Sequence, residues 1–106
     1  MKSFNVIHHD GEINVRIDDD GHAIIDVKNI NDHRILVTAI NRAFQSGATN
    51  GSLFTGEVVN DQMAGMHLMR AAKDKTWLGG KVTRLADGKD GPQFRIDWES
   101  FPQITE

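Results

Sequence analysis

Apolar and polar residues alternate along the N-terminal quarter of the chain. Ile13, Val15 and Ile17 are separated by polar or charged residues, and this period of two is typical of a half-buried strand. Asp-Gly pairs at 10–11 and 20–21 flank this stretch, and such pairs supply the positive φ that tight turns need. Residues 4–27 therefore predict a meander of three strands joined by two turns.

The period then changes to that of a helix. Asn31 is a capping residue, and Ile30 and Ile35 have the spacing of a hydrophobic staple around it. Gly47, after Ser46, can end the helix in the left-handed conformation at little cost. Between these signals one broad apolar stripe recurs at helical spacing, formed by Ile35, Leu36, Ala39, Ile40, Ala43 and Phe44.

The remaining pattern is less regular. It predicts a loop over 48–52, a strand over 53–59, a second helix from residue 60 or 61 to about 73, and a hairpin with strands over 77–86 and 93–98. The element order β-β-β-α-β-α-β-β indicates one α+β domain spanning residues 1–106. We expect an antiparallel or mixed sheet with two helices packed against it, while the order of the strands in that sheet stays open.

Three methionines stand out in the second predicted helix. Met63, Met66 and Met69 recur at steps of three. Methionine fills irregular cores and also lines adaptable binding surfaces, so the segment from Met63 to Met69 is either core or interface. Core packing is the interpretation that the pattern favours.

Composition agrees with a globular protein, because 39% of the residues are hydrophobic and 25% are charged. The chain has no cysteine, which excludes disulfides and thiolate chemistry. It also has no uninterrupted apolar stretch of the length that a secretory signal or a membrane span requires. These features predict a cytoplasmic protein that does not insert into membranes.

Charge is distributed unevenly. The net charge is −3, and residues 1–31 alone contain six acids and three bases. Such a local field repels nucleic-acid phosphates and favours a basic partner. The candidate partner-binding residues lie at the two turns of the meander: Asp10, Glu12, Asp18, Asp19 and Asp20.

Motifs for metal, nucleotide or catalytic chemistry fail on spacing. The run Asp18-Asp19-Asp20-Gly21 resembles a calcium loop, yet Arg16 and Val27 occupy positions where that loop needs carboxylates. Gly79-Gly80-Lys81 lacks the upstream glycine of a phosphate loop, because Lys75 stands there. No pair among the five histidines has the His-x-x-x-His spacing of a helical zinc site. The sequence therefore predicts no catalytic residue, no bound metal and no cofactor.

Nucleic-acid binding is disfavoured as well. The bases near the two predicted helices are interspersed with acids, and the chain contains no tyrosine. These bases are Arg34, Arg42, Arg70, Lys73 and Lys75.

The sequence is best interpreted as a non-enzymatic domain that binds a protein with a basic surface. Immunity proteins of bacterial toxins and phage inhibitors of nucleases have this general character, although no motif here belongs to a known family. A nuclease cleft is basic because it must hold phosphates. Two alternatives stay open: a small metal-dependent hydrolase that uses His8, His9, Asp10 and His22, and a structural subunit of a phage or other assembly.

Overall fold

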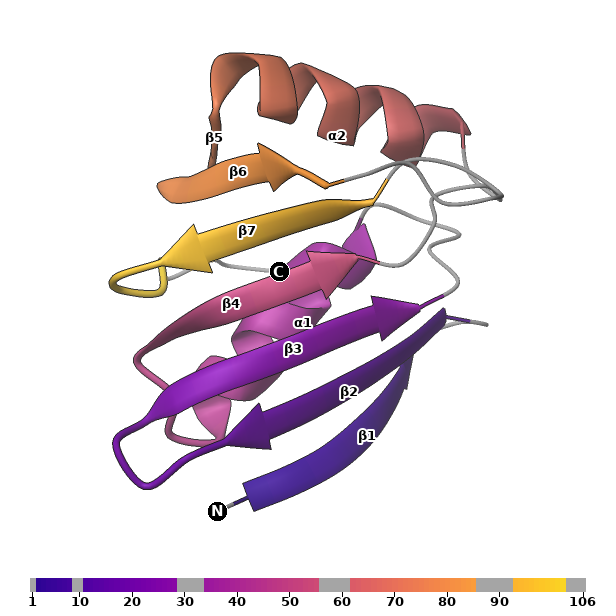
Figure 1. Cartoon of the computed structure of the whole chain (residues 1–106). Coiled ribbons are helices and arrows are strands. Elements are labelled where there is room, and N and C mark those ends of the chain that lie inside the picture. The colour runs from indigo at the N-terminus through magenta and orange to yellow at the C-terminus, as the bar shows by residue number, and fades with distance from the viewer. Residues whose placement is uncertain (1, 9–10, 29–33, 56–61, 86–92, 103–106) are drawn as a thin grey trace.

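The described part of the chain is built around one mixed sheet of seven strands (Figure 1). The computed structural model describes residues 2–8, 11–28, 34–55, 62–85 and 93–102. Along the sheet the strands follow the order β1-β2-β3-β4-β7-β6-β5. Two helices complete the element order β-β-β-α-β-α-β-β-β, so the predicted α+β class is confirmed.

The N-terminal meander forms as predicted. It consists of β1 (Lys2–His8), β2 (Gly11–Ile17) and β3 (His22–Lys28), each antiparallel to the next. The alternating residues Ile13, Val15 and Ile17 point to one face and are buried. Strict alternation fixes this register, because a slip of one residue would expose all three side chains.

Helix α1 (Arg34–Gln45) connects β3 to β4 (Asn50–Thr55) and makes these two strands parallel. Its apolar stripe is buried on the sheet, apart from Phe44, which stays exposed. The helix ends where Gly47 adopts a φ of 104°, as the sequence predicts. The predicted cap Asn31 and the staple residue Ile30 lie outside the described residues.

Strand β4 begins earlier than predicted. Asn50, Gly51 and Ser52 belong to the strand and not to a loop, while residues 56–59 lie outside the described part of the chain. Small and polar residues are compatible with this strand because β3 and β7 (Phe94–Trp98) pair with it on both sides. Backbone hydrogen bonds to both neighbours keep residues 50–52 in the strand, although their side chains show no alternating hydrophobic pattern.

The predicted strand over 77–86 is wrong, because the chain turns back on itself within it. The short β5 (Thr76–Trp77) pairs with β6 (Gly80–Arg84) around Leu78 and Gly79. Both turn residues have positive φ, 48° and 80°, as a type I′ hairpin turn requires. An Asn-Gly pair would have predicted this turn, whereas leucine at the first turn position is not typical of a hairpin turn.

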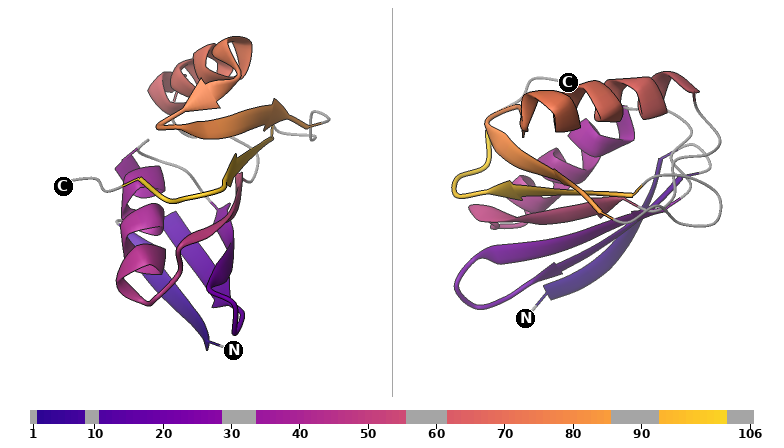
Figure 2. Two further views of the ribbon diagram at one scale, coloured as in Figure 1. Left: turned by 90° about the vertical axis from the view of Figure 1, so that its left-hand side faces the viewer. Right: turned by 45° about the horizontal axis from the view of Figure 1, so that its top comes forward.

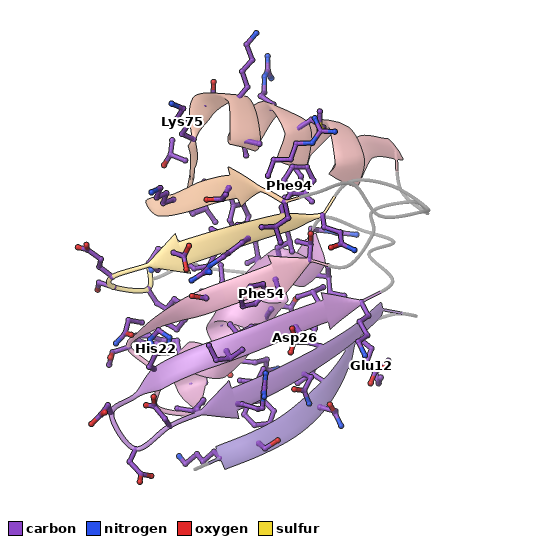
Figure 3. The ribbon with its side chains drawn as sticks, in the orientation of Figure 1. Glu12, His22, Asp26, Phe54, Lys75 and Phe94 are labelled. Atoms are coloured by element: carbon purple, nitrogen blue, oxygen red, sulfur yellow. The ribbon has the colours of Figure 1, made fainter. Side chains whose placement is uncertain are left out.

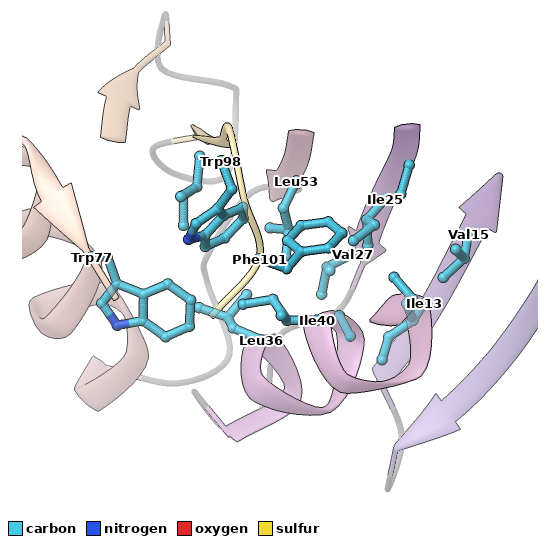
Figure 4. Close-up of a cluster of buried hydrophobic side chains, with 14 of the residues drawn as sticks. Ile13, Val15, Ile25, Val27, Leu36, Ile40, Leu53, Trp77, Trp98 and Phe101 are labelled. Atoms are coloured by element: carbon cyan, nitrogen blue, oxygen red, sulfur yellow. The ribbon is translucent and has the colours of Figure 1, made fainter. Parts of the chain in front are cut away.

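Both helices contribute to one hydrophobic core on the same side of the sheet (Figure 2). Helix α2 (Gln62–Asp74) lies along β5 and β6 and buries Leu68 and Ala71. In the core, Trp98 meets Trp77 edge-on at 6.0 Å between ring centroids and lies 5.7 Å from the ring of Phe101 (Figure 4). This aromatic row joins the edge of the sheet near α2 to its centre.

The end of α2 offers a test of backbone strain. Lys75 follows the helix with a φ of 63°, a conformation that glycine adopts at little cost and lysine does not. We expect Lys75→Gly to raise the free energy of unfolding by about 1 kcal/mol in urea denaturation. The control Lys73→Gly, inside the last helical turn, should lower it by about 1 kcal/mol. Loss of stability in both variants would contradict the left-handed cap.

Candidate functional site

The acidic turn between β2 and β3 is held rigidly by its own first residue. A side-chain oxygen of Asp18 accepts hydrogen bonds from the backbone N–H of Asp20 at 2.9 Å and of His22 at 3.0 Å. Gly21 donates to the backbone oxygen of Asp18 at 3.1 Å and adopts a φ of 82°. Asp18 therefore shapes the turn, and its carboxylate is partly committed to that role.

Asp19 and Asp20 stand at the tip of this turn and are exposed. Because Asp18 fixes the backbone beneath them, the two carboxylates project from a preorganised loop. The charge of Asp20 is consequently presented to a partner without a large ordering cost.

The C-terminal end of α1 lies beside the acidic turn. Thr49 donates its backbone N–H to the carbonyl of Gly21 at 2.9 Å, which ties the two segments together. The last carbonyls of a helix carry partial negative charge, so α1 adds to the field of the carboxylates. One base is already engaged here: Lys2 Nζ donates to the carbonyl oxygen of Ser46 at 2.9 Å.

A cavity of about 290 Å³ opens between these segments. Asp18 and Asp19 line one side, Ser46 and Gly47 line the other, and Lys2 and Ile17 complete it. Carboxylates and helix-end carbonyls thus surround a space that faces the same end of the molecule as the turn.

Glu99 strengthens the acidic character of this end. It follows Trp98, which pairs with Gly51, and Gly51 in turn pairs with Ala23 near the start of β3. The segment after β7 is fastened to the same region, because Phe101 donates its N–H to the carbonyl of Thr49 at 2.8 Å. We define the acidic end as Asp18, Asp19, Asp20 and Glu99 together with the C-terminus of α1.

Glu12, another predicted site residue, does not join the acidic end. Glu12 lies at the opposite end of β2, where it pairs with Lys28 (Figure 3). Asp18 is six steps further along the strand, a span of about 20 Å. Asp10 lies outside the described residues. The structure therefore brings three of the five candidate residues together and places Glu12 elsewhere.

The two histidines whose backbone lies in the meander strands, His8 and His22, are far apart. The Cα position of His8 pairs with Gly11 at one end of the meander, whereas His22 begins β3 at the other end. His22 Nδ1 is hydrogen-bonded to the side-chain oxygen of Asn50. Within the described residues no three His, Asp or Glu side chains converge as metal ligands. His9 and His33 lie outside the described residues, as do the side chains of His8 and His67.

The methionine segment is resolved at one position. Met69 is exposed, so the core packing favoured for it is wrong, and Leu68 and Ala71 form the buried face of α2 instead. The side chains of Met63 and Met66 lie outside the described residues.

No helix of the described residues is long and apolar enough to cross a membrane.

The open face of the sheet carries a polar network that the sequence did not reveal. Asp97 accepts from the hydroxyl of Ser52 and from Arg95 Nε, the latter at 3.0 Å. The guanidinium of Arg95 also lies 5.3 Å from the ring centre of Phe54, close enough for a cation–π contact. Since these residues come from β4 and β7, only the strand order could have predicted the network.

This open face balances its charges internally. Besides the Arg95–Asp97 pair, Arg16 lies 3.5 Å from Asp26 across β2 and β3. Bases and acids thus neutralise one another instead of forming a basic stripe for phosphates. The acidic end, in contrast, has three consecutive carboxylates, with the base Lys2 beside them.

Comparison with protein-family models, with curated proteins and with solved structures finds no match for this chain. The fold and the site thus define a two-layer α+β protein with an acidic end.

Proposed function

We propose that this protein is a non-enzymatic binding domain that caps a basic surface of a partner protein with its acidic end. The observation that carries the proposal is the rigid β2–β3 turn, which presents the exposed carboxylate of Asp20 beside the C-terminus of α1. Single-sign charge on a fixed scaffold accelerates association with a surface of the opposite sign.

The partner surface that this charge suits best is one that is basic for its own function. A nucleic-acid-binding cleft is such a surface, because it must neutralise phosphates. We therefore propose an inhibitor or immunity role against a nuclease, exerted in the cytoplasm. The carboxylates of the acidic end would occupy the place of the phosphates and block the cleft.

The test uses charge reversal at the tip of the turn. Asp20→Lys should weaken binding of a hexa-arginine peptide at low salt by about tenfold, because a carboxylate that attracts the peptide becomes a base that repels it. Titration calorimetry measures the change. The difference between the variant and the wild type should shrink as salt is added.

The control is Asp74→Lys, which makes the same change of charge at the end of α2, near the other edge of the sheet. It should leave the affinity for the peptide within about twofold of the wild type. Asp18 is unsuitable for this test, since its side chain also holds the turn. Equal losses in Asp20→Lys and Asp74→Lys would show that the peptide senses only net charge, and would overturn the proposal.

A further inference from the structure

The sheet has two edges of very different character. At one edge lies β5, which has two residues and is flanked by α2. At the other edge lies β1, which has seven residues and, among the described strands, pairs with β2 alone. An edge strand leaves alternate backbone N–H and C=O groups unpaired, and these groups can template another strand.

Strand β1 lacks the features that usually protect an edge. It contains no proline and no acidic residue. Its one lysine, Lys2, is at the first position, and its Nζ is bound to the carbonyl of Ser46. The side chain of Lys2 therefore points toward the C-terminus of α1 and does not oppose pairing of β1 with another strand.

Three side chains of β1, Phe4, Val6 and Ile7, are apolar, whereas a protected edge would have charged residues. Ile7 is 68% exposed, the largest value among the exposed apolar side chains of the described residues. Phe4 and Val6 point to the helix side, where they pack against the core but are only partly buried. Both faces of β1 thus have apolar surface that a further strand would cover.

We infer that β1 pairs antiparallel with β1 of a second copy of this chain, across a two-fold axis. Such pairing joins the two sheets into one, because it continues the ladder that β2 begins. On the helix side, Phe4 and Val6 of each copy meet the same residues of the other and extend the core. On the open side, Ile7 is covered by the β1 side chains of the second copy.

Charge also favours a second copy as the occupant. Because β1 has no carboxylate, two such strands do not repel one another through acids. In the antiparallel arrangement the start of one β1 lies beside the end of the other. The acidic turn lies at the Lys2 end of the meander, where Lys2 pairs with Ile17, so the two turns occupy opposite ends of the joined sheet. The dimer therefore separates its strongest like charges and presents two acidic ends.

Sedimentation equilibrium on the full chain tests this inference. The mass should rise from 11.8 kDa to twice that value with increasing concentration, with a dissociation constant in about the micromolar range that suits a small interface. Ile7→Lys should raise this constant by about tenfold or more, because it places a lysine from each copy at the joint.

Leu78→Lys is the matched control. It makes the same kind of replacement at an exposed apolar residue in the β5–β6 turn, by the other edge of the sheet. It should leave the dissociation constant unchanged. A monomer up to about millimolar concentration, or a dimer that Leu78→Lys weakens and Ile7→Lys does not, would overturn the inference.

Hydrogen exchange adds a readout that is specific to strand pairing. Alternate amides of β1, those that do not donate to β2, should become protected only at concentrations where the dimer forms. If the mass doubles while these amides exchange at the same rate, the copies associate through another surface. This dimer is independent of the acidic end, so Asp20→Lys should not change it.

Discussion

Trp98→Ala is expected to lower the free energy of unfolding by about 3–5 kcal/mol, a large fraction of the total for a domain of this size. The indole of Trp98 is buried, with 4% of its surface exposed, and contacts the rings of Trp77 and Phe101. Its removal leaves a cavity at the place where the core under α2 joins the core under α1. Denaturation in urea, followed by circular dichroism, measures the loss.

The variant Trp98→Phe separates packing from hydrogen bonding. It keeps an aromatic ring but loses the bond from Trp98 Nε1 to the carbonyl oxygen of Leu78, 3.2 Å long. We expect a smaller loss, about 1–2 kcal/mol, from this bond and the smaller ring. If Trp98→Ala lowers the free energy of unfolding no more than Trp98→Phe does, packing of the aromatic row does not stabilise the core.

Gly51→Ala is expected to lower the free energy of unfolding by about 3 kcal/mol, although it adds a single methyl group. That methyl would lie 2.9 Å from the backbone N of Ala23 and closer still to its carbonyl oxygen. Backbone atoms of a central strand cannot move aside as a flexible side chain can. The pairing of β3 with β4 would have to open, and chemical denaturation would report the cost.

Gly79→Ala is the control for the conformational effect of losing a glycine. Gly79 has a φ of 80°, but nothing lies within 4 Å of a methyl group placed there. Its replacement should cost about 1 kcal/mol, from backbone strain alone. A loss at Gly51 as small as that at Gly79 would contradict the close approach of β4 to β3.

Local periodicity predicted the parts of the fold that depend on neighbours in the chain. The alternation of Ile13, Val15 and Ile17 predicted β2, and the stripe from Ile35 to Phe44 predicted α1. Strand order depends on contacts between distant segments. The insertion of β7 between β4 and β6, and the early start of β4 at Asn50, left no local signal.

The candidate site was predicted in part for the same reason. The run from Asp18 to Asp20 is acidic in the sequence and stays clustered because it is one turn. Glu12 is acidic like this run but lies at the opposite end of the meander, since the straight strand β2 separates the two turns. Two features depend on contacts that the sequence does not show: the hydrogen bonds of the Asp18 side chain, and the pairing of Trp98, the neighbour of Glu99, with Gly51.

The most direct test of the acidic end is to map where a basic ligand binds. A hexa-arginine peptide titrated into the isotope-labelled protein at low salt should shift amide resonances at residues 18–22, 46–49 and 99. The resonances of Glu12 and Lys28, at the opposite end of the meander, should stay in place. Shifts that centre on Glu12, or that spread evenly over all the acids, would contradict a binding function of the acidic end.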